Sequence, residues 1–149
     1  MSEPNLTGIE LPESPLPAGN YVPIVQYGEI VYLAGQDPLK DGKLQYVGKL
    51  GSDFSLEEGY EAARLCALTL LAILQDYLGD LSRVRRILKV VGYVNSAPGF
   101  SEQPAVVNGA SDLLVRVFGD NGKHARTAIG VNELPGNIAV EVDLIAAVE

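Results

Sequence analysis

The sequence predicts a two-layer α+β domain in which two helices cover one face of a mixed β-sheet. Two segments, 55–78 and 101–118, repeat apolar residues at steps of three and four, as helices with one buried face do. Short β-prone segments precede the first helix, separate the two helices and follow the second. The 149 residues have the length of one ordinary domain.

The chain opens with a proline-rich segment, residues 1–19, which we expect to be an extended arm because proline lacks a backbone donor. The folded domain is then expected over residues 20–149. Residues 21–27 and 29–34 predict a β-hairpin that turns at Gly28. Asp41 and Gly42 form a second tight-turn signal.

The first helix has clear end signals. Ser55 and Glu58 form a capping box, in which both side chains bond to backbone N–H groups of the first turn. Gly79 is placed to end the helix. Downstream, residues 84–95 are nearly all apolar or β-branched and predict a central strand covered on both faces. Two more strands are expected over 125–131 and 139–148.

The last strand predicts an oligomer. Its alternate residues 140, 142, 144, 146 and 148 are apolar, whereas Glu141 and Asp143 lie on the opposite side. With both helices on one face of the sheet, the second face has no cover within the chain. Such a face is usually buried against another subunit, so we expect a closed homo-oligomer, and a trimer is one symmetry that achieves this.

Composition narrows the classes of function. The net charge of −8 disfavours nucleic acid and anionic membrane surfaces as partners. The chain has one cysteine and one histidine, so neither an internal disulfide nor a Cys/His metal site is expected. We find no basic, apolar export signal at the start and no apolar segment long enough to cross a bilayer, which predicts a cytoplasmic protein.

Arg126 is the leading candidate for ligand binding. Its neighbours on the same side of the expected strand, Ala128 and Gly130, are small, which would leave a notch beside the guanidinium. A guanidinium matches a carboxylate in shape and charge, so a small carboxylate would fit. Glu141 is expected on the adjoining strand. It could form an ordinary ion pair with Arg126 or orient a water molecule beside a ligand, and spacing alone leaves both open.

Other reactive side chains give weaker signals. Cys66 lies in the apolar part of the first helix and is expected to be a core residue. His124 has no serine or cysteine partner recognisable from spacing and is expected to be an exposed loop residue. Gly35, together with Gln36, is expected to form a turn after the second strand.

Several short motifs together resemble the RidA (YjgF) family of reactive-intermediate deaminases, which also carries the label L-PSP endoribonuclease. The resemblance covers residues 20–149. Its motifs are GNYVP at 19–23, LAGQDP at 33–38, VN at 107–108, ARTAIGV at 125–131, LP at 134–135 and VEV at 140–142. It implies a chorismate-mutase-like α+β fold, assembled as a homotrimer whose sheets close a barrel and whose ligand clefts lie between subunits.

The resemblance also implies an activity: hydrolysis of short 2-imino and 2-enamino acids, such as 2-aminoacrylate and 2-iminobutyrate, to 2-oxo acids and ammonia. Arg126 would hold the substrate carboxylate and Glu141 would place or activate water. Tyr21, Asn108 and the Gly35 backbone would line the cleft, and no cofactor would be required. An ionised Glu141 close to Arg126 should have a lowered pKa, which favours orienting water over accepting a proton.

Two positions depart from the family pattern. Ala34 stands where members often have serine, and Ala128 where they often have cysteine, so the predicted cleft lacks a hydroxyl and a thiol. A non-catalytic module that binds a small carboxylate in the same notch is therefore the alternative. Ribonuclease activity is disfavoured because the acidic chain has no basic track for phosphates and a single histidine.

Overall fold

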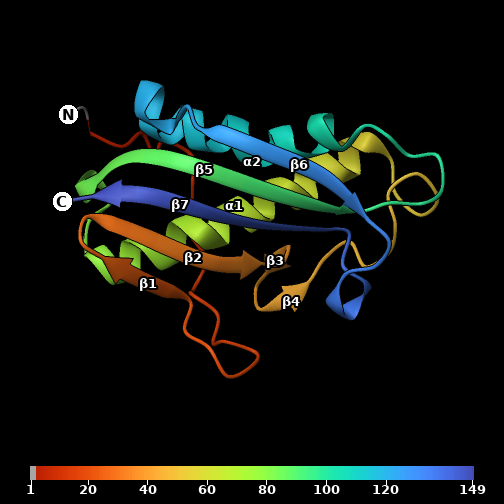
Figure 1. Cartoon of the computed structure of the whole chain (residues 1–149), viewed down its shortest axis with the longest axis horizontal. Helices are drawn as coiled ribbons and strands as arrows, with labels where there is room; N and C mark the ends of the chain where they lie inside the picture. Colours follow the sequence, from red (N-terminus) through yellow and green to blue (C-terminus); the bar gives the residue numbers. More distant parts are fainter. Residues whose placement is uncertain (1–2) are drawn as a thin grey trace.

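The computed structural model describes residues 3–149 and confirms the two-layer α+β architecture (Figure 1). The two helices are α1 (Leu56–Leu78) and α2 (Gln103–Phe118). The strands are β1 (Ile24–Tyr27), β2 (Ile30–Gln36), β3 (Leu39–Lys40), β4 (Lys43–Leu44), β5 (Val84–Asn95), β6 (Ala125–Val131) and β7 (Val140–Val148). Three short 3-10 helices complete the fold: η1 (Leu81–Arg83), η2 (Gly119–Gly122) and η3 (Pro135–Asn137).

The main sheet has the strand order β1-β2-β7-β5-β6. β5 and β6 pair in parallel and the other neighbours pair antiparallel, so the sheet is mixed, as predicted. β3 and β4 form a separate small hairpin around Asp41 and Gly42. Both helices lie on the same side of the main sheet, and its other side is open in Figure 1.

The end signals of α1 work as the sequence predicts. The Ser55 side chain accepts a hydrogen bond from the Glu58 N–H, and the Glu58 carboxylate accepts one from the Ser55 N–H at 3.0 Å. Gly79 ends the helix in the left-handed conformation, with φ of 82°. The predicted hairpin of β1 and β2 and the predicted strand limits 84–95 and 125–131 are also confirmed.

Three local predictions are corrected by the structure. β5 is not the central strand, because β7 lies in the middle of the sheet, and within the chain β5 is covered only on its helix side. α2 begins at Gln103 rather than at residue 101. Gly35 and Gln36 are not a turn: they belong to β2, where an irregularity in the pairing with β7 falls between Leu33 and Gln36. A bulge of this kind changes the direction in which neighbouring groups point.

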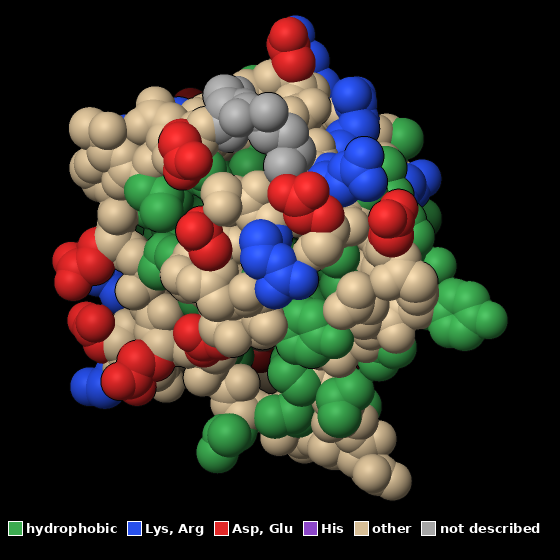
Figure 2. Space-filling view, turned by 90° about the vertical axis from the view of Figure 1, so that its left-hand side faces the viewer, with side chains coloured by type: hydrophobic (Ala, Val, Ile, Leu, Met, Phe, Trp, Pro, Cys, Tyr) green, Lys and Arg blue, Asp and Glu red, His purple; other side chains and the backbone are tan. Residues whose placement is uncertain are grey.

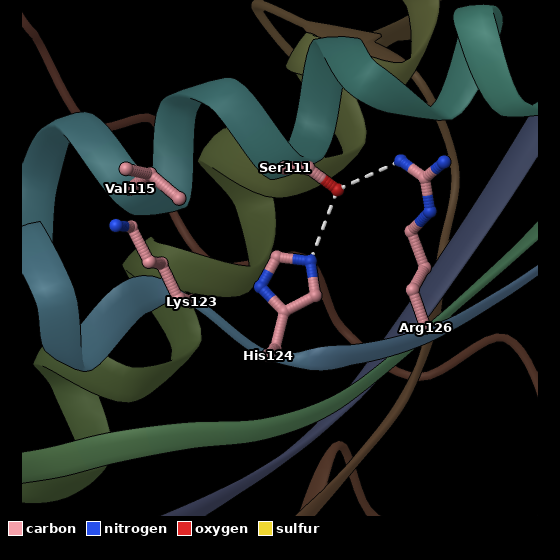
Figure 3. A pocket seen from close by; sticks show the side chains of 5 residues that line it. All are labelled: Ser111, Val115, Lys123, His124 and Arg126. Atoms are coloured by element: carbon pink, nitrogen blue, oxygen red, sulfur yellow. Dashed lines mark hydrogen bonds between the residues drawn. The ribbon is translucent and has the colours of Figure 1, made fainter.

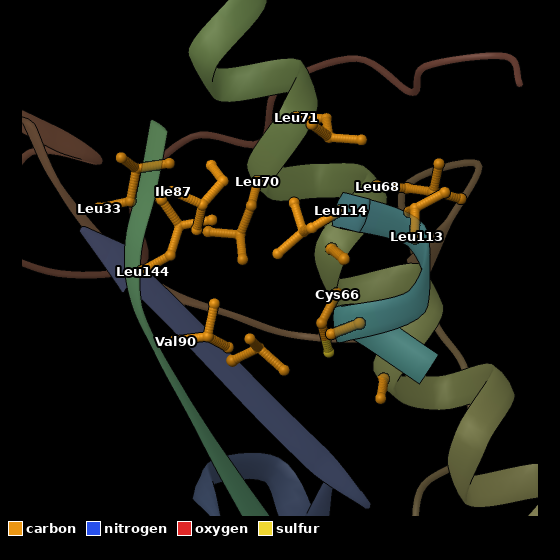
Figure 4. Packing of buried hydrophobic residues seen from close by; sticks show 14 of the residues in the cluster. Leu33, Cys66, Leu68, Leu70, Leu71, Ile87, Val90, Leu113, Leu114 and Leu144 are labelled. Atoms are coloured by element: carbon orange, nitrogen blue, oxygen red, sulfur yellow. The ribbon is translucent and has the colours of Figure 1, made fainter. Parts of the chain in front are cut away.

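The core fills the space between the helices and the sheet (Figure 4). Leu70 and Leu114 of the two helices meet Val90 and Leu144 of the sheet there, and all four are almost fully buried. Cys66 is a buried core residue, as predicted. Burial is also the largest cause that raises the pKa of its thiol well above the ordinary value, so the thiol stays protonated.

The N-terminal arm crosses the helices. The Asn5 N–H donates to the Val117 carbonyl at 2.8 Å, and Ser14 donates to the carboxylate of Asp76 on α1. Apolar side chains of the arm pack against the core, namely Leu6, Ile9 and Leu11. The arm is therefore held along both helices, while the division of the chain at residue 20 stays a prediction.

The open face of the sheet carries apolar side chains. Tyr27 is 84% exposed, and Val25, Tyr32 and Ile129 are each about half exposed. In Figure 2, which looks onto one end of the molecule, hydrophobic side chains gather in the lower part and at the right-hand margin, acidic side chains dominate the left, and basic side chains gather at the upper right. Among the described residues, we find no helix with the length and hydrophobicity of a membrane span.

Candidate functional site

The Arg126 side chain lies against α2. Val90 of β5 pairs with both Arg126 and the inward-facing Leu144, which places Arg126 on the helix side of the sheet. Its Nη1 donates to Asn108 Oδ1 at 2.7 Å and to Ser111 Oγ at 3.1 Å, and its Nη2 donates to the Pro104 carbonyl at 3.3 Å. Three acceptors from one helix thus fix the guanidinium, and we call this group the arginine cluster: Arg126, Asn108, Ser111 and the Pro104 carbonyl.

The arginine cluster contains no carboxylate. The ion pairs found within residues 3–149 join Arg85 to Glu29 and Lys123 to Asp120, so the positive charge of Arg126 is not neutralised there. A guanidinium has five N–H groups. The three hydrogen bonds use both N–H groups of Nη1 and one of Nη2, which leaves Nε–H and the second Nη2–H without a partner in the described chain. These two N–H groups remain available to the oxygens of a carboxylate.

His124 lies next to Ser111 (Figure 3). It is a loop residue between η2 and β6, as predicted, but the prediction that it is exposed is wrong. The imidazole is half-buried; its Nε2 lies 3.0 Å from Ser111 Oγ and its Nδ1 2.6 Å from the Gly122 carbonyl oxygen. A shallow cavity of about 240 Å³ lies here, and its lining residues are Ser111, Val115, Lys123, His124 and Arg126. The serine partner was missed because it lies on α2, and only the packing of α2 beside β6 brings the two together.

The second candidate residue, Glu141, lines a different cavity, of about 360 Å³. Tyr21 and Gly35 line it too, as the resemblance implies, together with Asp37, Pro135 and the end of the N-terminal arm. A Cβ atom at Gly35 would overlap the Glu141 carboxylate, so only glycine lets this side chain lie across β2. We call this group the carboxylate pocket.

The acids of the carboxylate pocket have raised pKa values within one chain. Burial raises the pKa of Glu141 above its ordinary value, and the negative charges of Asp37 and Asp143 raise it further. Burial also raises the pKa of Asp37. Burial, a hydrogen bond to Asp143 and nearby carboxylates raise the pKa of Tyr93 to about 12. The lowered pKa predicted for Glu141 is therefore wrong within one chain, because no arginine lies beside it to stabilise its charge.

One chain does not bring Arg126 and Glu141 together. β5 lies between β6 and β7, which separates the two strands by about 10 Å. The two side chains also point to opposite faces, since Glu141 pairs with Tyr93 on the open face and Arg126 lies on the helix side. The prediction that their strands adjoin is wrong, and of the two alternatives for Glu141 the ion pair with Arg126 does not form within one chain.

The remaining predicted site residues divide between the two groups. Asn108 belongs to the arginine cluster and Tyr21 and Gly35 to the carboxylate pocket. Ala128 packs partly against the core beside Arg126. The Gln103 side chain fills the notch that the sequence predicts at Gly130, because a Cβ atom built there would lie 2.7 Å from Gln103 Nε2.

In residues 3–149, no three His, Cys, Asp or Glu side chains are grouped closely enough for a metal ion.

Two helices on a mixed sheet, with an arginine held at the edge strand, define a chorismate-mutase-like α+β protein. Residues 2–148 match the family model described as YjgF/chorismate mutase-like endoribonuclease. The chain therefore belongs to the YjgF (RidA) family.

Known relatives cover almost the whole chain. Protein TCP17 of Trypanosoma cruzi is 48% identical over 139 residues, which are 93% of this chain and 87% of that protein. The structure of Atu1372 from Agrobacterium tumefaciens, a protein of unknown function, is 42% identical with a TM-score of 0.91, over 96% of this chain and 88% of that one.

Two further structures extend the comparison. One from Shewanella oneidensis MR-1, described as an endoribonuclease, is 39% identical with a TM-score of 0.93, over 95% and 94% of the two chains. RidA from Psychrobacter sp. PAMC 21119 is 22% identical with a TM-score of 0.64, over 91% and 94% of the two chains. The likeness to RidA shows the common fold alone.

Proposed function

We propose that this protein hydrolyses short 2-imino and 2-enamino acids to 2-oxo acids and ammonia. The observation that carries the proposal is the arginine cluster: Arg126 is held by three uncharged acceptors and keeps two N–H groups free for a carboxylate. A positive charge that is fixed without a carboxylate of its own is suited to an anionic ligand. The resemblance of the sequence motifs to the reactive-intermediate deaminases supports short imino and enamino acids as the ligands.

The reaction needs a fixed substrate, a water molecule and a base. A 2-enamino acid first takes up a proton at carbon and becomes the protonated imine. Water adds to the imine carbon: a C–O bond forms, the C=N π electrons become a lone pair on nitrogen, and the proton that water loses passes to Glu141. Glu141 returns this proton to the nitrogen. The C–N bond then breaks with its electrons going to nitrogen, the new hydroxyl gives its proton to the departing ammonia, and the carbon becomes the carbonyl of the 2-oxo acid. Within one chain the pKa of Glu141 is raised, which suits the acceptance of a proton, whereas the charge of Arg126 from a second copy would act in the opposite direction. We therefore assign Glu141 both the orientation of water and the transfer of its proton.

A complete site would take residues from two copies of the chain. Arg126 and Glu141 lie on opposite faces of one sheet, so a short imino acid bound by one side chain does not reach the other in the same chain. The half-exposed Tyr32 and Ile129 give the open face an apolar surface of the kind that subunits bury. We propose a homotrimer in which the arginine cluster of one copy meets the carboxylate pocket of the next.

A coupled assay tests the activity. Threonine dehydratase releases an imine from threonine, and semicarbazide competes for that imine. Added protein should accelerate the formation of 2-oxobutyrate over the dehydratase alone. Arg126→Ala should abolish the acceleration because the carboxylate loses its anchor, whereas Lys43→Ala, a change at an exposed position in β4, should keep it.

The alternative is a module that binds a small carboxylate without turnover, and Ala34 and Ala128 motivate it because they remove polar groups from the predicted cleft. Saturable binding of 2-oxobutyrate with no acceleration in the coupled assay would favour this alternative. Ribonuclease action, which the family description suggests, finds little support in a chain with a net charge of −8 and an acidic pocket.

A further inference from the structure

A chain of hydrogen bonds runs from donor to acceptor in one direction through four residues: Arg126, Ser111, His124 and Gly122. A carbonyl oxygen only accepts, so Nδ1 of His124 carries the proton that Gly122 receives. A guanidinium only donates, so Ser111 Oγ accepts from Arg126. In a neutral imidazole with Nδ1–H, Nε2 is an acceptor, and the Ser111 hydroxyl therefore donates to it. Ser111 accepts one hydrogen bond and donates the other, so the three contacts fit one assignment of protons.

The surroundings keep His124 neutral. Burial lowers the pKa of His124, and the charge of Arg126 lowers it further against the opposing effect of the Gly122 carbonyl. The other charged groups nearby are Lys123, which lines the same cavity, Asp120, which pairs with Lys123 at 3.3 Å, and Arg86, which donates to the Lys123 carbonyl. α2 presents uncharged Ser111 and Val115 to this cavity. Arg126 is the charged group that shifts the pKa of the imidazole.

The direction of the Ser111 hydroxyl matters for Arg126. A serine within a helix can turn its hydroxyl back to a carbonyl of the preceding turn, and its lone pairs then point elsewhere. The His124 acceptor prevents this turn, so an Oγ lone pair stays aimed at Nη1. Figure 3 shows the result: one guanidinium nitrogen faces Ser111, and the opposite edge of Arg126 points away from His124.

We propose that His124 and Ser111 are positioning residues, which hold the guanidinium of Arg126 with its free Nε–H and Nη2–H edge turned toward the substrate carboxylate. His124 itself touches neither the carboxylate nor the reacting carbon. The inference rests on the proposed function for the role of Arg126 as the carboxylate anchor. The hydrogen-bond chain can nevertheless be tested without any turnover.

NMR of the ligand-free protein tests the chain directly, because His124 is the only histidine in the sequence and gives the single imidazole signal. Spectra of 15N-labelled protein should show the neutral form with its proton on Nδ1. Ser111→Ala should raise the pKa of His124, because it removes a donor that stabilises the neutral ring. Val115→Ala, one helical turn away in the same cavity, should leave that pKa in place. A proton on Nε2, or an unchanged pKa in Ser111→Ala, would refute the chain.

Kinetics test the consequence for substrate binding. Ser111→Ala and His124→Leu should each raise the KM for the imine roughly tenfold, the scale of one hydrogen bond to a charged group, while kcat stays close to that of the wild type. Ser111→Thr keeps the hydroxyl and should restore KM. A fall in kcat at constant KM, or no recovery in Ser111→Thr, would overturn the positioning role.

The two proposals fail in different ways. Deaminase activity together with an Nε2–H imidazole would refute the hydrogen-bond chain and leave the proposed function standing. A wild-type protein that neither turns over imines nor binds 2-oxobutyrate would refute the proposed function, and the positioning role would fall with it, even where NMR supports the hydrogen bonds.

Discussion

Glu141 is the side chain whose chemistry depends most on its neighbours. Burial raises its pKa first, and Asp37 and Asp143 then add negative charge beside it. Since Glu141 must be ionised to accept a proton from water, activity should fall as the pH falls through this raised pKa. The acid limb of the pH profile therefore reports on the environment of one carboxylate.

Replacing a neighbouring charge should move that limb. Asp37→Asn removes a negative charge from the carboxylate pocket, which makes the ionised form of Glu141 less costly and lowers its pKa. The acid limb of kcat/KM should shift to lower pH, as measured in the coupled assay across a pH series. Asp41→Asn is the control, because Asp41 is exposed in the β3–β4 turn with φ of 53°, a conformation that asparagine adopts readily. A limb that stays in place in Asp37→Asn would contradict this account of Glu141.

Gly35 gives a second residue-scale prediction. In Gly35→Ala the new methyl group would overlap the Glu141 carboxylate and lie 3.1 Å from its Cγ, so the carboxylate must move. A displaced base should reduce kcat by about 10²-fold. The melting temperature should change little, because Glu141 is half-buried and can swing outward. Full activity in this variant would show that the position of Glu141 does not matter.

The elements of the fold follow closely from local sequence signals, because those signals act within a few residues. The capping box at Ser55 and the left-handed glycine at 79 satisfy backbone groups of α1 itself. Alternation in β7 separates its buried from its half-buried residues without reference to other strands. The order of strands in the sheet is a different matter, since β7 inserts between β2 and β5 through long-range pairing.

The contact between the two helices is tight at one residue. A Cβ atom at Gly109 of α2 would collide with the Tyr60 carbonyl of α1, and backbone does not swing aside as a side chain does. Gly109→Ala should therefore lower the free energy of unfolding by about 1–3 kcal/mol, measured by urea denaturation. Alanine otherwise stabilises a helix relative to glycine, so a more stable variant would contradict the close approach of the helices.

At the scale of the whole molecule, the open sheet face and the divided site point to the same conclusion. Apolar side chains remain exposed on the open face, including Tyr27 at 84% and Val25 at 51%. The arginine cluster and the carboxylate pocket are each incomplete as a site for a small imino acid. An assembly that covers the face would also allow the two groups to meet across a subunit boundary.

Mixing two inactive variants tests this division. Arg126→Ala and Glu141→Gln should each be inactive alone, because each lacks one half of the site. When the two are unfolded together and refolded, about a quarter of the sites in random ring-shaped oligomers would combine both intact halves, and activity should recover to about that level. Mixing without refolding provides the control. No recovery from oligomers that have reassembled would place both residues in the site of a single copy.

The sequence by itself determined the helices, most strand limits and the buried cysteine, and it singled out Arg126 as the candidate ligand-binding residue. It did so because periodicity, caps and side-chain chemistry are local properties. Only the tertiary structure decided that β5 separates Arg126 from Glu141, that Ser111 reaches His124 and that the pKa of Glu141 rises. These facts depend on which distant segments become neighbours, and burial and charge act through space rather than along the chain.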